Sequence, residues 1–346
     1  MAKPSNTARF PMQRLAAAAA LGCGVLLTAC GGGGGDSPAT STTPLLSQSD
    51  ATAYAANASS SGESTAAAVD SVIDTTAGLA IPVAQPGTTA SSDRMQALAA
   101  PLSLPVSGVT VDCAGGGTAT LSITGGTLSS QLNGQLDAGE HYSVTFAQCS
   151  GGTGRAQLSG GVEMDVVSAD RSTSPQTLAV SLTVTHLTLT LPSGSATLAG
   201  TASASRSVVT TNGTTTTTSH VTVPSATLAT AFNGRNATFT LSDLDATRTL
   251  TSVGGVTTGS QYSGHHTLTG TADGRTISLN FATNGNANYD AGGALVSGAW
   301  TAVRPNDTIA VTVANGIVVM TVDDGNDGTI DHTWTFTTAQ LNAAAG

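Results

Sequence analysis

The amino-acid sequence predicts an all-β protein, a long-stranded antiparallel meander curled into a barrel-like or folded-over sheet, after a disordered N-terminal tether. Two observations lead to this prediction. Apolar and polar residues alternate with period two after Val106, for example over 118–124 and 308–313, and turn dipeptides separate the alternating segments. Such alternation is typical of strands with one buried and one solvated face.

The turn signal is mainly the dipeptide Asn-Gly. It occurs at 133–134, 212–213, 233–234, 284–285 and 315–316, and Gly254-Gly255 and Asp273-Gly274 are of the same kind. Both residues of a tight hairpin turn need positive φ, so these dipeptides between alternating segments predict hairpins. Their number within one region favours a continuous antiparallel meander.

One predicted strand, over 176–191, changes phase along its length. Leu182 and Val184 share one face, whereas Leu187 and Leu189 have the opposite parity. A β-bulge inserts one residue and returns the apolar side chains to the same face, so the sequence predicts a bulge near His186.

Charge excludes several kinds of partner. Only 9 % of the residues are charged, and the chain has 11 basic against 21 acidic residues. Lys3, Arg9 and Arg14 all lie in the first 29 residues, so removal of that segment leaves eight arginines and a formal net charge of −13. A chain of this kind is repelled by phosphate-rich partners, and we expect no nucleic-acid ligand.

The N-terminus has the features of an export signal. Three basic residues precede an apolar stretch of 13 residues, Leu15 to Leu27, which is the length of a signal-peptide core and too short for a membrane span. The stretch ends in Leu27-Thr28-Ala29-Cys30 followed by five glycines. This tetrapeptide resembles the lipobox of bacterial lipoproteins.

The resemblance implies a signal peptide over 1–29 and lipidation of Cys30 with palmitate-type acyl chains, which anchor a protein firmly when two or more are present. Gly31 after the cysteine implies sorting to the outer membrane. An ordinary signal peptide cut nearby is the alternative. The Gly-, Ser-, Ala- and Thr-rich segment 30–105 shows no sustained periodicity, so we expect a flexible tether there and a β domain over 106–346.

Two cysteines, Cys113 and Cys149, remain in the predicted β domain. Each lies at a predicted strand end, and an exported domain folds in an oxidising compartment. We therefore expect a disulfide between them, with a pair of free or redox-active thiols as the alternative.

The densest acidic segment runs from Asp323 to Asp331 and resembles the Asp/Asn/Gly loops that bind Ca²⁺. The resemblance implies ligands from Asp323, Asp327, Thr329 and Asp331, with Gly328 at the sharp turn. Gly325 and Trp334 depart from that pattern at the third and twelfth positions. The alternative is a plain acidic hairpin turn between two strands.

No enzyme motif is present. His265 and His266 are neighbours on a predicted strand and point to opposite faces, so they cannot ligate one ion together without a bulge. The sequence predicts no catalytic residues and no cofactor apart from the calcium hypothesis. The expected function is a non-enzymatic binding, adhesive or envelope-structural module, attached to the membrane by its lipid. The alternative is a carrier of apolar ligands with a cavity inside the curled sheet.

Overall fold

The structure is a computed structural model that describes residues 46–79, 106–113, 116–131, 133, 135–150, 157–191, 194–232, 235–272 and 275–345. The predicted signal peptide and Cys30 lie outside these residues. So do parts of the predicted tether, at 30–45 and 80–105.

Fifteen strands form one sheet. The first eight are β1 (Val106–Asp112), β2 (Thr118–Gly125), β3 (Glu140–Ser150), β4 (Gln157–Asp170), β5 (Gln176–Leu191), β6 (Gly194–Thr211), β7 (Thr214–Phe232) and β8 (Arg235–Val253). The others are β9 (Val256–Ala272), β10 (Arg275–Thr283), β11 (Ala287–Asp290), β12 (Leu295–Val303), β13 (Asp307–Ala314), β14 (Ile317–Asp324) and β15 (His332–Thr337). Two short helices, α4 (Leu128–Gln131) and α5 (Thr338–Ala345), complete the β domain.

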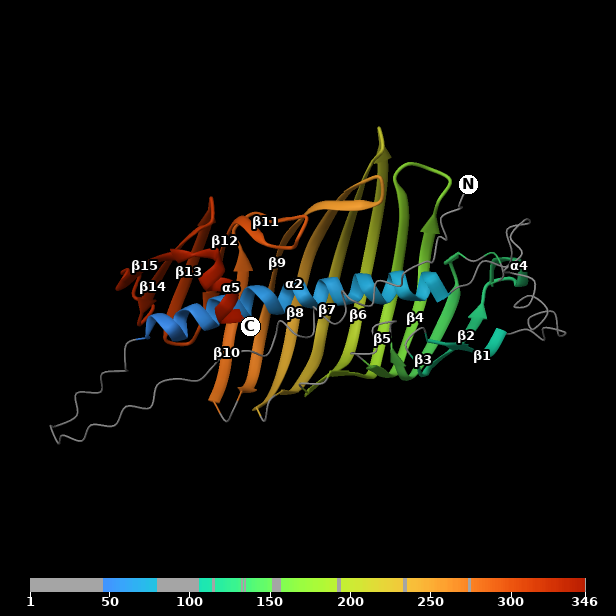
Figure 1. Ribbon diagram of the computed structural model, residues 1–346, viewed down its shortest axis with the longest axis horizontal. Coiled ribbons are helices and arrows are strands. Elements are labelled where there is room, and N and C mark those ends of the chain that lie inside the picture. The colour runs from blue at the N-terminus through green and yellow to red at the C-terminus, as the bar shows by residue number, and fades with distance from the viewer. Residues whose placement is uncertain are drawn as a thin grey trace, which may run out of the picture.

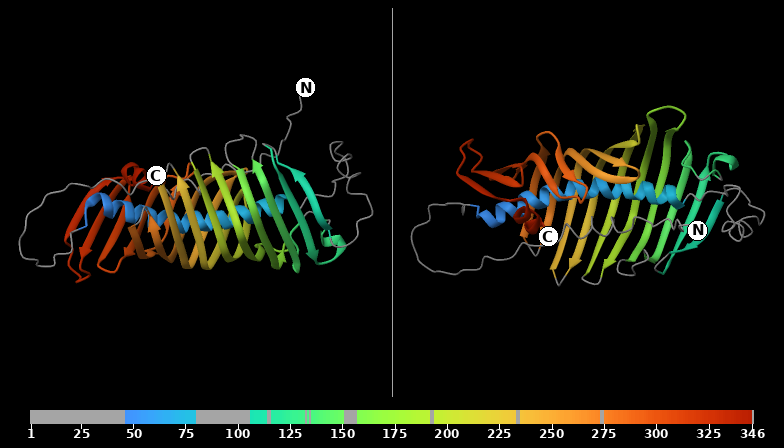
Figure 2. Two further views of the ribbon diagram at one scale, coloured as in Figure 1. Left: turned by 90° about the horizontal axis from the view of Figure 1, so that it is seen from below. Right: turned by 45° about the horizontal axis from the view of Figure 1, so that its top comes forward.

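The antiparallel meander is confirmed. Each strand pairs with the next in the chain, except that β10 pairs with β12 while the short β11 bridges β9 and β12. The sheet curves into a partial ring and is not a closed barrel (Figures 1 and 2). Among the described strands, β1 and β15 are its two edges. The middle strands β6 to β9 are the longest, with 17 to 19 residues each.

Backbone angles confirm several of the predicted turns. Asn212-Gly213, Gly254-Gly255 and Asn315-Gly316 each have positive φ at both residues and join β6–β7, β8–β9 and β13–β14. Asn133 instead lies in the longer connection between β2 and β3 that contains α4. A dipeptide alone does not distinguish a hairpin turn from a longer loop.

The predicted bulge near His186 is also confirmed. The register between β5 and β6 shifts between Val184 and Leu187. On the other side, β4 places Gly160 opposite Leu187, and a Cβ on Gly160 would lie 1.6 Å from the His186 carbonyl oxygen. Only glycine permits this approach of the two backbones.

The structure differs from the predicted tether in one large element. Helix α2 (Gln48–Leu79) spans 32 residues and runs across the strands along the concave face of the sheet (Figures 1 and 2). Ser47 caps it, because the Ser47 hydroxyl oxygen accepts the Asp50 N–H at 3.2 Å. Among the residues that the structure describes, no helix has the length and hydropathy of a membrane span.

Helix α2 and the concave face of the sheet share one apolar core. Its largest fully buried side chains include Tyr142, Leu244, Tyr262, Phe281, Trp300 and Met320. Alternate residues of most strands face this core, and their neighbours, many of them Thr and Ser, face solvent on the convex side. The helix therefore completes a core that the open sheet cannot enclose by itself.

Candidate functional site

The contact between α2 and the sheet is made by small residues. Positions 51, 55, 58, 62, 66, 69 and 73 form one buried stripe, occupied by Ala, Ala, Ala, Gly, Ala, Val and Ile. Their spacing of three or four residues is that of one helix face. The sequence analysis missed this stripe because alanine and glycine give only a weak hydrophobic signal.

Gly62 marks the closest approach of α2 to the sheet. A Cβ at this position would lie 2.3 Å from the Tyr262 hydroxyl oxygen and 2.8 Å from Nδ1 of His266. Both side chains come from β9 and are buried, with 1 % and 2 % exposed surface. Any larger residue than glycine would therefore push the helix off the sheet.

His266 is the buried histidine of this contact. Its Nε2 lies 2.9 Å from the Ser61 hydroxyl oxygen, and its ring stacks on Phe281 with centroids 4.8 Å apart. Burial, reinforced by the nearby His265, lowers the pKa of His266 to about 4. The imidazole is therefore neutral at pH 7. His265 is exposed, as expected for the neighbouring residue of a strand.

The Ser61–His266 pair lacks the third member of a catalytic triad. Within the described chain, neither His266 Nδ1 nor the Tyr262 hydroxyl has a hydrogen-bond partner. A triad requires a carboxylate at the second ring nitrogen and a nucleophile open to substrate. Here the pair holds a helix against a sheet.

A buried ion cluster fixes the second half of α2. The Asp70 carboxylate lies 3.0 Å from Arg206 of β6 and 3.2 Å from Arg248 of β8. Arg248 also lies 3.5 Å from Glu63, which is about two turns before Asp70 on the same face of α2. Burial raises the pKa of Glu63, and the Arg248 charge opposes that rise. The Asp70 side chain is only 5 % exposed, so the cluster is shielded from solvent.

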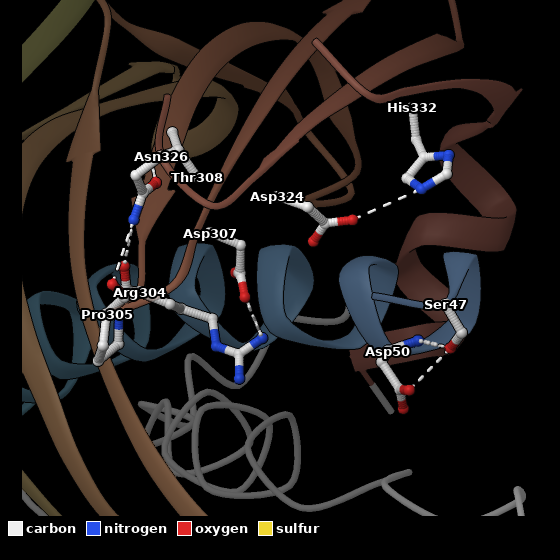
Figure 3. A network of polar contacts seen from close by, with 9 residues as sticks. All are labelled: Ser47, Asp50, Arg304, Pro305, Asp307, Thr308, Asp324, Asn326 and His332. Atoms are coloured by element: carbon white, nitrogen blue, oxygen red, sulfur yellow. Dashed lines mark hydrogen bonds and ion pairs between the residues drawn. The ribbon is translucent and has the colours of Figure 1, made fainter. Parts of the chain in front are cut away.

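A second group of polar contacts lies on the last strands and their loops, beside the N-terminal end of α2 (Figure 3). Arg304 pairs with Asp307 at 3.1 Å and lies 3.9 Å from the centroid of the Tyr54 ring on α2. Burial raises the pKa of Asp307, and the Arg304 charge opposes that rise. Asp324 of β14 lies 3.5 Å from His332 of β15.

One apolar cavity of about 50 Å³ lies between α2 and strands β5 to β7. It is lined among others by Val69, Val72, Leu187, Leu198, Ala202 and Ala226. Pockets that hold small-molecule ligands measure about 300–1,000 Å³. With α2 in place, this cavity therefore has room for little more than solvent.

The predicted disulfide is present between Cys113 and Cys149, with their Cα atoms 5.4 Å apart. It joins the end of β1 to the end of β3 across β2. Both cysteines lie at strand ends, as the sequence predicted.

The predicted calcium loop joins β14 to β15, and its carboxylates bond to the loop's own backbone. Asp323 accepts the N–H groups of Asp327 and Gly328 at 3.1 and 2.9 Å. Asp331 accepts the Asp324 N–H at 2.8 Å, and Asp327 accepts the Thr329 N–H at 2.8 Å. The described residues contain no group of three or more His, Cys, Asp or Glu placed to hold a metal ion. This geometry matches the alternative of an acidic hairpin turn, and the calcium site stays a hypothesis.

Asn326 fixes this loop to its neighbour. Its side-chain amide donates to the carbonyl oxygens of Arg304 and Pro305 and accepts a hydrogen bond from the Thr308 hydroxyl at 2.7 Å (Figure 3). These hydrogen bonds attach the loop between β14 and β15 to the turn between β12 and β13.

Comparison of the chain with protein-family models, with curated proteins and with solved structures finds no match. Its function is therefore inferred from the sequence and from the geometry described above.

Proposed function

We propose that this chain is an outer-membrane lipoprotein whose β domain is a non-enzymatic structural or binding module of the cell envelope. The anchor is argued from sequence alone, from the signal-peptide core and the tetrapeptide Leu27-Thr28-Ala29-Cys30. The role of the domain is argued from one structural observation, the filling of its concave face by the chain's own helix.

Several contacts oppose removal of that helix. The stripe of small residues on α2 permits close packing, and Trp300 donates from its indole Nε1 to the Ala55 carbonyl oxygen at 3.3 Å. Asp70 and Glu63 of the helix pair with Arg206 and Arg248, which without these carboxylates would face an apolar groove. A charge left unpaired in such a place costs several kcal/mol. A domain built in this way supports a rigid surface better than it supports an exchangeable ligand site.

The carrier of apolar ligands is the second candidate. The cavity beside α2 has an entirely apolar lining, which is the chemistry that such a ligand needs. Its volume of about 50 Å³ is too small for an acyl chain unless α2 moves. The two candidates therefore differ in whether the helix leaves the groove.

Metabolic labelling with an alkynyl fatty acid tests the anchor. We expect the parent chain to be labelled and to sediment with outer membranes, and Cys30→Ser to be unlabelled and released. Cys23→Ser is the matched control, because this cysteine lies within the predicted signal peptide. Equal labelling of parent and Cys30→Ser would contradict the lipoprotein proposal.

Titration with an apolar fluorescent probe such as N-phenyl-1-naphthylamine distinguishes the structural module from the carrier of apolar ligands. The structural module predicts no saturable binding by the full chain. Saturable binding at one probe per chain, lost when Ala202→Leu fills the cavity, would support the carrier instead.

A further inference from the structure

The two edges of the open sheet differ in how well they are protected. Edge β1 is interrupted, since its register shifts between Val106 and Val109 and Gly108 has φ of 71°. It also ends in the charged Asp112. Bulges and charges of this kind prevent a further strand from pairing with an edge.

Edge β15 has none of these protections. Its pairing with β14 is continuous from His332 to Thr337, and the segment His-Thr-Trp-Thr-Phe-Thr contains no proline and no acidic or basic residue besides the histidine. Within the described chain, no strand pairs with its outer side. Helix α5, which follows it directly, packs against α2.

The hydrogen-bond pattern shows which backbone groups are available. The Thr338 N–H donates to the Gly316 carbonyl oxygen at 3.0 Å, and hydrogen-bonded pairs alternate in an antiparallel ladder. Residues 332, 334 and 336 therefore bond to β14, and the N–H and C=O groups of residues 333, 335 and 337 point outward. In agreement, the Thr337 N–H donates to the Gln340 side chain and not to β14.

We propose that the chain dimerises through β15, which pairs antiparallel with β15 of a second copy about a two-fold axis at Thr335. In this register Thr335 pairs with its own copy, and Thr333 faces Thr337 of the second copy. The Thr337 carbonyl oxygen accepts the Thr333 N–H, while the Thr337 N–H stays bonded to Gln340. It continues the meander across the axis into one sheet of two chains.

Side chains complement one another in this register. Trp334 stands opposite Phe336 of the second copy, in the non-hydrogen-bonded position where cross-strand side chains lie closest. Trp334 is half-buried in the single chain and stacks on His332 with ring centroids 5.1 Å apart. Pairing would cover its remaining surface with an aromatic ring.

The acidic residues near β15 favour antiparallel over parallel pairing of the two copies. The loop that precedes β15 carries Asp323, Asp324, Asp327 and Asp331. Antiparallel pairing places the two copies of this loop at opposite ends of the new strand pair, whereas parallel pairing would bring them side by side. Repulsion between the two acidic loops would oppose parallel pairing and therefore favours the antiparallel, two-fold arrangement.

Disulfide cross-linking between cysteines introduced into the full chain, carried out in bacterial membranes, tests the position of the two-fold axis. Residues that pair in a hydrogen-bonded position lie about 5.5 Å apart between Cα atoms, within the range that a disulfide spans. We expect Thr335→Cys to give a two-chain band without reductant and a single-chain band with it. Thr312→Cys, exposed on the convex side of β13, is the matched control and should stay a single chain. Equal cross-linking of the two variants would overturn the proposal.

Sedimentation of the purified full chain gives the second readout. The parent should have the mass of two chains, and Thr335→Pro that of one, because proline removes an outward N–H and leaves the bonds to β14 in place. Thr335→Lys, which places like charges opposite each other at the axis, should also give a single chain if the proline variant misfolds. A parent of single-chain mass, or one that forms open-ended polymers, would contradict the two-fold dimer.

Discussion

The Asp70 carboxylate of α2 lies 3.0 Å from the Arg206 guanidinium of β6, although 136 positions separate the two residues in the chain. Arg248 of β8 completes the cluster at 3.2 Å from the same carboxylate. Glu63 lies 3.5 Å from Arg248, so two acidic residues of α2 face two arginines and fix the helix across two neighbouring parts of the sheet.

Asp70→Asn should lower the free energy of unfolding by about 3–5 kcal/mol, because Arg206 loses its contact with this buried carboxylate and Arg248 keeps only Glu63. Urea denaturation of the full chain measures the change. Asp245→Asn is the control, since Asp245 pairs with His220 at 2.9 Å on the surface with both side chains about half exposed. An exposed pair of this kind is worth at most about 1 kcal/mol. Equal effects of the two substitutions would show that the Asp70 cluster does not hold α2.

His266 should make the stability fall as the solution becomes acidic. Its pKa is about 4 in the folded protein against an ordinary value of 6.5, so between these values the unfolded chain binds a proton that the folded protein does not. This proton uptake by the unfolded chain lowers the free energy of unfolding, by about 3 kcal/mol at the acidic end of that pH range.

The pH dependence of the unfolding free energy, compared between the parent and His266→Phe, measures this effect. The Phe variant lacks the titrating group, and its stability should change less between pH 7 and 4. The raised pKa of Glu63 acts in the opposite direction, and it is common to both proteins. Parallel profiles for the two proteins would rule out His266 as the source of the acid sensitivity.

Gly62→Ala should destabilise the docked helix, although alanine is the better helix former by about 1 kcal/mol. The added methyl group would overlap the Tyr262 hydroxyl and the His266 ring, and both side chains are buried in the core. Limited proteolysis should cut α2 faster in this variant than in the parent. Ala67→Gly, one helix turn further on a half-buried face, is the control for propensity alone. A Gly62→Ala protein as resistant as the parent would refute the close contact.

Removal of Cys113 or Cys149 should lower the melting temperature of the oxidised protein. The bridge closes a loop with a sequence separation of 36, worth about 4 kcal/mol in the chain-entropy model. The double variant Cys113→Ala, Cys149→Ala should be no less stable than either single one, since each deletes the same cross-link. Additive losses, measured by calorimetry, would indicate that the thiols act separately.

Millimolar Ca²⁺ should leave the melting temperature unchanged, because Asp323, Asp327 and Asp331 already accept backbone N–H groups of their own loop. A bound ion would stabilise the folded state by about 2.7 kcal/mol at a hundred times its dissociation constant. Calorimetry of the parent and of Asp327→Ala distinguishes the two cases. A calcium-dependent rise in the parent that Asp327→Ala abolishes would establish the calcium site.

The sequence by itself determined those features that depend on neighbouring residues along the chain. Period-two alternation and paired turn residues with positive φ were enough to predict a continuous meander, because hairpins form between adjacent segments. The parity change from Val184 to Leu187 placed the bulge at His186, since a strand with one buried face records its register in its own side chains. Two cysteines at predicted strand ends, in a chain expected to be exported, were enough to predict the disulfide.

Only the tertiary structure decided how the concave face is filled. Helix α2 buries alanine and glycine, whose weak hydrophobic signal is hard to distinguish from the composition of a flexible segment. The helix becomes part of the core only because it packs on a sheet that starts 27 residues later. Tertiary structure also brings Asp70 to Arg206 and Ser61 to His266, because the helix crosses strands that are far from it in sequence. Contacts of this kind follow from the curvature of the whole sheet, and no local pattern in the chain encodes that curvature.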